Sequence, residues 1–518
     1  MTTCSPGGFL NVLIFSEPTF PRHPGGAGKS THVLAAELVR RGHRVAILCE
    51  CQEADELEII DGVHVHRLNT DAVKDAPRST REVETANHCL RYIEERLDPA
   101  RLDLLYDSGG FLSFFFRVAR SLKARFGVPY LIHYRYLVAH DRQTHENDTK
   151  KSLSAQLLGL DTLIPETTQC VPARFADLTV CPSRFQADFV EHQYRPASGP
   201  VRVLPEPIDL TRPDAERVRA WRAEFAAPEA RLIFFGGRID SHSKNPRLVA
   251  RAFAAIRTEE PNARLVLPVK TPGVPKEFQS IEHAVLTLPW VTDRSLLATA
   301  LASMDIGLVP STYESFGLMC AELLAVGTPV IGSAVGAMPE LIQHGRNGFL
   351  LAGEPGEGWV QQIADYCLTL LRAPSPETMR AAARNSTRRY SIETVGALAE
   401  ELCELAVASR TPARNQFAAP RFSPEDEAHY LRVLHELSGR AALEPASRVI
   451  AHWPATANDR CSECTRSRLA NGHIGLRANP IARAWGALRG RLPSSVARSI
   501  EDVCPLGLVQ RTSPKQNG

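Results

Sequence analysis

The sequence lacks a long hydrophobic run, and its first residues lack the features of a signal peptide. No stretch approaches the roughly 18 consecutive apolar residues that a membrane-spanning helix requires. The opening residues, MTTCSPGGFLNV, contain neither a basic start nor a long apolar segment. We therefore expect a cytoplasmic protein whose 12 scattered cysteines are reduced thiols.

The chain also lacks a strong charge of either sign. Its 60 Lys and Arg against 58 Asp and Glu give a net charge of +2, so we expect no nucleic-acid partner. A content of 44% apolar and 23% charged residues is typical of a globular protein, and 518 residues allow two to four domains. The sequence shows no short internal repeat.

Buried strands and amphipathic helices alternate along the first half of the chain. Residues 11–15 form a short apolar run, residues 31–41 carry apolar side chains at helical spacing, and residues 44–49 form the next buried strand. Gly42 is expected to end the helix between them. Further strand-like runs follow at 102–106, 128–134 and 177–183. This alternation predicts an α/β fold with a parallel sheet.

A second α/β set begins near residue 201, after a seam rich in proline. It contains the strand candidates RLIFFGGR, NARLVLPV, HAVLTLPW, DIGLVPS, TPVIGS and NGFLL, and a helix over 245–257. We predict a Rossmann-like domain over residues 1–200, a second over 201–394, a helix over 395–410 that could pack back, and a partly disordered tail over 411–518. The tail, with 15 Lys and Arg against nine Asp and Glu, leaves peripheral membrane contact open.

A glycine-rich turn, GGAGKST at residues 25–31, allows two interpretations. The phosphate loop of an NTPase needs G-x-x-x-x-G-K-[ST] directly after a strand. Here His23 stands where the first glycine is required, and about nine residues separate the strand from Gly25. In the alternative, Gly25 and Gly26 let the backbone approach a ligand in a cleft between two domains, beside the free N–H groups of a helix start.

Residues 305–351 contain the most informative pattern of the chain. Two glutamates, Glu314 and Glu322, lie eight positions apart and are followed by GTPVIGS and PELIQHGRNGFLL. We expect Glu314 in the loop after a strand and Glu322 one or two turns into the next helix. A carboxylate there can accept hydrogen bonds from two neighbouring hydroxyl groups, such as those of a ribose.

This pattern resembles the family-4 glycosyltransferases of the GT-B fold, which transfer a sugar from a nucleotide diphosphate with retention of anomeric configuration. The resemblance extends over residues 11 to about 408 and implies an α/β fold, with two Rossmann-like domains whose parallel sheets face each other across a cleft. It implies that Glu314, as a catalytic residue, and Glu322 bind the sugar and ribose of the donor. It also implies that the diphosphate meets backbone N–H groups of Ser315, Phe316, Gly317 and Leu318.

Two basic residues after the first strand of the second domain extend the resemblance. In GGRIDSHSK, Arg238 and Lys244 match the family's phosphate-binding residues. Negative charge grows on the diphosphate as the glycosidic bond breaks, so cations held there stabilise the transition state more than the ground state. Within the resemblance, Gly25 and Gly26 contact the donor from the first domain, and Lys29 starts a helix rather than binding a triphosphate.

A histidine and three departures from the family pattern concern the rest of the cleft. His133, at the end of VPYLIH, falls where the family often has a histidine near the transferred sugar, so it is a second catalytic candidate. Tyr134 follows it where the family usually has an acid. Glu206 and Pro207 replace a common Asn-Gly in the linker, and Ala337 replaces a common glycine in GAMPE.

The sequence contains no D-x-D motif, the usual metal-diphosphate clamp of the other glycosyltransferase fold, so we expect no metal and no cofactor besides the nucleotide-sugar co-substrate. Cys461 and Cys464, with His452 and His473 nearby, form a weak zinc pattern for which free thiols are the alternative.

We predict transfer from a UDP- or GDP-sugar to an acceptor that the sequence does not define: a small glycoside, a lipid-linked sugar, a polysaccharide or a peptide. A sugar-nucleotide epimerase or phosphorylase on the same fold remains an alternative. A P-loop-like NTPase and a non-catalytic nucleotide-sugar-binding protein are further alternatives.

Overall fold

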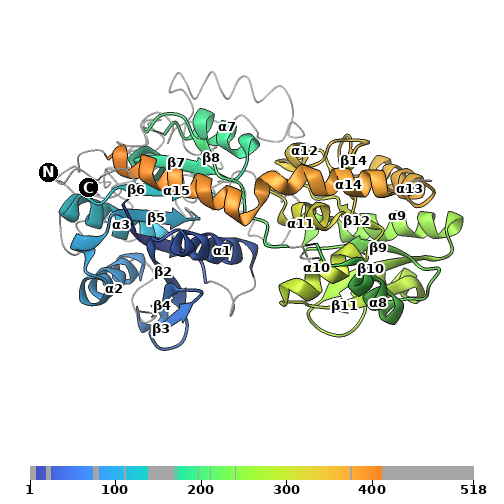
Figure 1. The fold of residues 1–518 in the computed structure, drawn as a ribbon, viewed down its shortest axis with the longest axis horizontal. Helices are drawn as coiled ribbons and strands as arrows, with labels where there is room; N and C mark the ends of the chain where they lie inside the picture. The colour runs from blue at the N-terminus through green and yellow to red at the C-terminus, as the bar shows by residue number, and fades with distance from the viewer. Residues whose placement is uncertain are drawn as a thin grey trace, which may run out of the picture.

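The computed structural model contains two α/β domains that lie side by side along the long axis of the molecule (Figure 1). It describes residues 8–18, 25–73, 81–109, 113–137, 169, 172–196, 198–210, 212–237, 239, 241–373 and 376–410. Arg238, the tail over 411–518 with its cysteine pair, and most of the loop after β6 lie outside the described residues. No helix in the described ranges is both long and apolar enough to cross a membrane.

The first domain is built on an eight-stranded sheet with the order β3-β4-β2-β1-β5-β6-β7-β8. Its strands pair in parallel except for β3, which runs antiparallel to β4 at the edge of the sheet. Both faces of the central strands are covered, which explains their continuous apolar sequences. The strands are β1 (Asn11–Ser16), β2 (Arg44–Cys51), β3 (Glu56–Ile60), β4 (Val63–Asn69), β5 (Leu104–Ser108), β6 (Tyr130–His133), β7 (Leu178–Cys181) and β8 (Arg202–Val203).

Helices cover both faces of this sheet. The first of them ends as predicted, because Gly42 adopts a φ of +101° and the N–H of His43 closes back onto the carbonyl of Leu38 at 3.1 Å. The helix begins at Gly26, ahead of the periodic apolar run at 31–41 and ahead of Lys29, its expected start, so Lys29 lies in its first turn. The helices are α1 (Gly26–Arg40), α2 (Arg81–Arg96), α3 (Ser113–Phe126) and α7 (Arg184–Gln193), with 3-10 turns η1 (Thr70–Val73) and η2 (Pro99–Arg101).

The second domain has a six-stranded, fully parallel sheet with the order β11-β10-β9-β12-β13-β14. All six predicted strands are present: β9 (Arg231–Phe235), β10 (Ala263–Val269), β11 (Val285–Pro289), β12 (Ile306–Val309), β13 (Val330–Ser333) and β14 (Gly348–Leu351). The helices around it are α8 (Ala215–Phe225), α9 (Pro246–Glu259), α10 (Arg294–Ala302), α11 (Leu318–Val326), α12 (Met338–Leu341), α13 (Glu357–Leu371) and α14 (Pro376–Thr387), with η3 (His242–Lys244), η4 (Lys276–Ala284) and η5 (Arg388–Tyr390).

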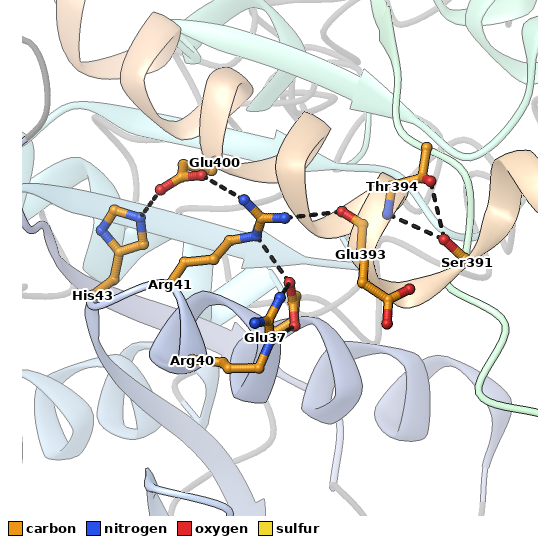
Figure 2. Close-up of polar contacts among 8 residues, drawn as sticks. All are labelled: Glu37, Arg40, Arg41, His43, Ser391, Glu393, Thr394 and Glu400. Atoms are coloured by element: carbon orange, nitrogen blue, oxygen red, sulfur yellow. Dashed lines mark hydrogen bonds and ion pairs between the residues drawn. The ribbon is translucent and has the colours of Figure 1, made fainter.

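The helix α15 (Ile392–Ala408) leaves the second domain and packs on the first, crossing the boundary between them in Figure 1. Its apolar face joins the core formed by α1 and the first sheet. A Cβ at Gly396 would collide with the side chain of Glu37 on α1, so a glycine permits this close approach. Figure 2 shows the polar part of the contact, in which Arg41 donates to Glu400 at 2.9 Å and His43 pairs with Glu400 at 3.0 Å.

The chain crosses between the domains twice, and the two crossings lie side by side. The N–H of Ile208 in the first crossing donates to the carbonyl of Tyr390 in the second at 2.8 Å, and Ile208 bridges Ser391. Two adjacent crossings form a natural hinge. Away from the hinge, Glu340 of the second domain accepts hydrogen bonds from the N–H groups of Arg184 and Phe185 at the start of α7, at 3.1 and 2.9 Å.

Both sheets have a point where the strand order reverses. In the first sheet β1 lies between β2 and β5, and in the second β9 lies between β10 and β12. Open α/β sheets bind ligands at the carboxyl ends of strands beside such switch points. Gly25 and Gly26 follow β1, while η3 follows β9, so the topology brings the glycine-rich turn and Lys244 to these two positions.

Candidate functional site

The first pair of the site joins the loop after β12 to the turn after β9. Lys244 Nζ forms an ion pair with Glu314 Oε1, and Ser311 Oγ donates to the same oxygen at 2.8 Å. Backbone contacts hold the two segments together, since the N–H of Thr312 donates to the carbonyl of Ser243 at 2.8 Å. Both charged side chains keep some exposure, 19% for Lys244 and 15% for Glu314. A polar ligand can therefore reach them.

The backbone of Glu314 is fixed by the segment after β13. A Cβ at Gly336 would collide with the carbonyl oxygen of Glu314, and Gly336 has a φ of +54°, so this position requires glycine. The next residue, Ala337, donates its N–H to the same carbonyl at 3.1 Å. Ala337 has right-handed helical dihedrals, with φ −80° and ψ −3°. Its departure from a glycine in the family pattern therefore costs no backbone strain.

The second carboxylate lies on α11, where the sequence predicts it. Glu322 is the fifth residue of that helix and is buried. Its Oε1 accepts a hydrogen bond from Arg294 Nη2 at 2.9 Å, and Arg294 Nε lies 3.2 Å from Asp209 Oδ2 in the linker. Arg294 also donates to the carbonyl of Asp209, at 2.9 Å from Nη2. The linker acid, an arginine at the start of α10 and Glu322 thus form one connected chain.

The glycine-rich turn of the first domain reaches this same place. Lys29 Nζ lies 3.3 Å from Glu322 Oε1, which makes it an ion pair between the two domains. Burial lowers the pKa of Lys29, and the charge of Glu322 opposes that effect. A Cβ at Gly26 would stand 3.1 Å from Leu318 Cδ1, so the first residues of α1 and α11 meet across the cleft.

Two helix starts therefore converge on the cleft without side-chain caps. Neither Gly25 before α1 nor Gly317 before α11 makes a side-chain capping bond, and neither helix has an acidic residue in its first turn. The free N–H groups and the positive ends of both helix dipoles favour an anion between them. Gly317 has a φ of +91°, whereas Phe316 is buried in the core and contributes packing as well as its backbone. Ser315 bonds to the first domain, because its carbonyl accepts from Ser183 Oγ at 2.8 Å.

On the first domain, the polar groups at the carboxyl ends of β5 and β6 are buried and bonded to one another. Arg135 forms an ion pair with Glu206 of the linker, with only 3% and 5% of their side chains exposed. Arg135 Nε donates to Ser108 Oγ at 2.8 Å. The linker acid that departs from the family pattern is thus paired with an arginine just after His133. The sequence shows each residue but gives no sign that they meet.

His133 lies fully buried at the end of β6. Its Nδ1 is 2.7 Å from the hydroxyl of Tyr106. Burial, and to a lesser extent the charge of Arg135, holds the pKa of His133 well below its usual range, so the ring is neutral at physiological pH. The structure gives His133 no exposed surface in the cleft, and its catalytic role stays a prediction from the resemblance.

A cavity of about 330 Å³ lies beside the hinge. Both crossings and the second domain line it, through Val203, Pro205, Phe316 and Tyr390 among others. None of the charged residues of the cleft cluster (Lys29, Asp209, Lys244, Arg294, Glu314 and Glu322) contributes to its wall. Within the described ranges, no group of three or more His, Cys, Asp or Glu side chains is arranged to hold a metal ion.

Sequence reasoning did not single out Arg294 or Asp209 as site residues. Arg294 follows Asp293, which caps α10, so the local pattern indicates only a helix start. Asp209 ends the linker and is common to the family pattern, but nothing in the sequence connects it to α10. Arg294 at the start of α10 reaches Glu322 on α11 and also holds Asp209 of the linker, so the connection depends on how these segments pack.

Comparison with known proteins identifies this architecture. Solved structures with the same arrangement include sucrose-phosphate synthase from Thermosynechococcus elongatus, with a TM-score of 0.63 and 19% identity over 77% of this chain and 100% of that one. HepE from Anabaena, in complex with UDP and glucose, matches with a TM-score of 0.56 and 16% identity over 76% of this chain and 99% of that one. These likenesses define a GT-B fold.

Two family models match the chain in order: Glycosyltransferase Family 4 over residues 24–212 and Glycosyl transferases group 1 over residues 230–372. The chain belongs to the family-4 glycosyltransferases. Among its relatives, D-inositol 3-phosphate glycosyltransferase of Saccharomonospora viridis is 27% identical over 71% of this chain and 86% of the relative. That of Actinosynnema mirum is 28% identical over 53% of this chain. The chain spans 66% of the A. mirum relative and 57% of the Streptomyces avermitilis relative, less than two thirds of their length.

Proposed function

We propose that the protein transfers a sugar from a nucleotide diphosphate sugar, of the UDP or GDP type, to an acceptor hydroxyl with retention of configuration. One observation carries the proposal. Two carboxylates of the second domain, Glu314 and Glu322, each lie beside a cation at the carboxyl edge of the sheet, opposite the glycine-rich turn of the first domain. This is the place where open α/β sheets bind nucleotides.

The roles follow from the chemistry of each group. Glu314 and Glu322 accept hydrogen bonds from hydroxyl groups of the sugar and ribose, because Oε2 of each faces no cation that the structure records. Lys244 balances the charge of the diphosphate, and the resemblance assigns Arg238 to the same task. The start of α11 offers backbone N–H groups to the same phosphates.

Transfer then requires little further machinery. The bond between the anomeric carbon and the phosphate oxygen breaks, and the diphosphate keeps the electron pair. The acceptor oxygen forms its bond to the same face of the sugar, and its proton passes to the departing phosphate oxygen. Lys244 stabilises the charge that grows on this leaving group, so no separate base is assigned.

Two structural neighbours support a nucleotide donor. HepE was solved with UDP and with UDP-glucose, and the catalytic domain of starch synthase IV of Arabidopsis thaliana was solved bound to ADP and acarbose. These neighbours share the fold at 18% identity or less, so the donor base of this protein is part of the proposal.

A thermal-shift screen against UDP, GDP and their sugars tests binding first, because a ligand that binds only the folded state raises the melting temperature. Release of the diphosphate in the presence of candidate acceptors then tests transfer. We expect Glu314→Gln to abolish transfer while the melting temperature is kept, since the amide cannot accept hydroxyl hydrogen bonds with both of its polar atoms.

Glu282→Gln is the matched control, because Glu282 is an exposed acid of the same domain. Full transfer activity in Glu314→Gln would remove the central assignment. Isomerised sugar without an acceptor, or cleavage that depends on added phosphate, would replace transfer by an epimerase or phosphorylase activity. Magnesium-dependent ATP turnover that disappears in Lys29→Ala would instead indicate an NTPase.

A further inference from the structure

A lysine of the first domain lies in the charged cluster of the second. Lys29, in the first turn of α1, is the residue of the cluster that comes from the opposite domain. Its ammonium group contacts Glu322 Oε1 at 3.3 Å, and Arg294 Nη2 donates to the same oxygen at 2.9 Å. The start of the same helix lies close to Leu318 of the second domain, at Gly26. The position of this ammonium therefore depends on the closure of the cleft.

We propose that Lys29 is a donor-binding residue, which adds a cation to the nucleotide diphosphate from the first domain when the cleft is closed. This inference rests on the proposed function and deepens it. It differs from the expectation that Lys29 only begins a helix.

The charge balance of the cluster supports attraction of a diphosphate. Three cations, Lys29, Lys244 and Arg294, stand against three acids, Asp209, Glu314 and Glu322. Removal of Lys29 makes the charge of these described residues one unit more negative, which disfavours the entry of an anion. The partial burial of the pair makes the lost attraction larger than it would be on an open surface.

The geometry leaves Lys29 able to serve a ligand as well as Glu322. An ammonium group has three N–H donors on a flexible stem, and the structure records one contact, with Glu322. The remaining donors lie beside the residue proposed to bind the ribose, a short reach from the phosphates that the ribose carries. Lys29 and Arg294 both bind Oε1, so Oε2 of Glu322 stays available for a hydroxyl group.

The test compares nucleotides with and without the terminal phosphate. Isothermal titration measures UDP and UMP, or GDP and GMP if guanine gives the larger thermal shift, on wild type, Lys29→Met and Lys29→Arg. We expect Lys29→Met to weaken diphosphate binding by about 10- to 100-fold, the range of one hydrogen bond to a charged group. The loss for the monophosphate should be smaller, and Lys29→Arg should retain most of the affinity.

The pH dependence gives a second measurement. Glu322, Arg294 and Asp209 are the charged groups that face Lys29, and burial lowers its pKa. Diphosphate affinity of the wild type should therefore fall as alkaline pH removes the proton of Lys29, earlier than for an ordinary lysine. Lys29→Arg should not show this fall, because a guanidinium stays protonated.

Lys276→Met is the control, because Lys276 is an exposed lysine of the second domain whose side chain is 80% accessible. Unchanged or tighter diphosphate binding in Lys29→Met would overturn the inference, and so would an equal loss for both nucleotides, which indicates that Lys29 only supports Glu322. If the wild type binds none of these nucleotides, the proposed function itself fails. The two failures are therefore distinguishable.

Discussion

The charged pairs at the cleft edges of the two sheets differ in how far they are exposed to solvent. At the edge of the first sheet, Arg135 and Glu206 are almost completely buried and paired with each other. At the corresponding edge of the second sheet, Lys244 and Glu314 remain partly exposed. The two pairs have the same chemistry, a cation beside a carboxylate, but one is closed to a ligand and the other is open to it.

This difference separates groups that hold the molecule together from groups that can act on a substrate. A buried pair supports the folded state only while both partners are present, because the loss of one partner leaves an uncompensated charge in the interior. A partly exposed pair contributes little to stability and can exchange its partner for a ligand. Substitutions at the first edge should therefore lower stability, and substitutions at the second edge should lower activity.

The largest effect is expected for Glu206→Ala at the first edge. This change leaves the guanidinium of Arg135 buried without its carboxylate, so the free energy of unfolding should fall by about 3–5 kcal/mol. Urea denaturation followed by tryptophan fluorescence measures the loss. Because Glu206 lies in the linker, hydrogen exchange should rise at the ends of β5 and β6 and in the hinge.

The double variant Arg135→Met with Glu206→Leu provides the control, since replacing both partners by apolar side chains often restores stability. A loss below about 1 kcal/mol in Glu206→Ala would show that the pair behaves as an exposed one, and the division between the two edges would not hold.

A smaller but more selective effect is expected for Lys244→Met at the second edge. Loss of one donor to the leaving group should lower kcat/KM for transfer by about 10²–10³, which corresponds to roughly 3–4 kcal/mol in the transition state. Stability should change by less than about 1 kcal/mol, because the pair with Glu314 is partly exposed. Steady-state kinetics and thermal melting measured on the same preparation check both values, with Lys276→Met alongside.

If Lys244→Met instead lowers the melting temperature as much as Glu206→Ala while the folded enzyme turns over normally, then the second edge is structural as well.

Much of the fold is predictable from the sequence because the central strands are buried on both faces. Their apolar runs need no tertiary information, and all six strands of the second sheet lie where those runs predict them. The hairpin of β3 and β4 is different, since β3 alternates charged and apolar residues at the edge of the sheet, with Ile59 65% exposed. Its pattern is short and lacks the continuous apolar run of the central strands, so the sequence does not predict it as a strand.

The site residues that lie on one continuous segment were predictable from the sequence. The contacts between residues of separate segments were not. Glu314 and Glu322 occupy one loop and one helix, so their spacing alone indicates their positions. Arg294 and Lys29 reach Glu322 from α10 and from the other domain, and that meeting depends on how the sheets and the domains pack. The pairing of Arg135 with Glu206 has the same origin, because it joins the segment after β6 to the linker, and these are far apart in the sequence.

The smallest effect is expected at the start of α15, which belongs to the second domain in sequence and to the first in packing. Ser391 caps this helix by accepting a hydrogen bond from the N–H of Thr394 at 3.2 Å, and it also bridges Ile208 at the hinge. Ser391→Ala should lower stability by about 1 kcal/mol, the usual cost of an N-cap. Ser409→Ala, at the exposed opposite end of the same helix, should change it by less than about 0.5 kcal/mol. Hydrogen exchange along α15 separates the two outcomes. Faster exchange confined to the first turn indicates the loss of a cap. Faster exchange of the whole helix would mean that its contact at the hinge, rather than its packing on α1, holds α15 on the first domain.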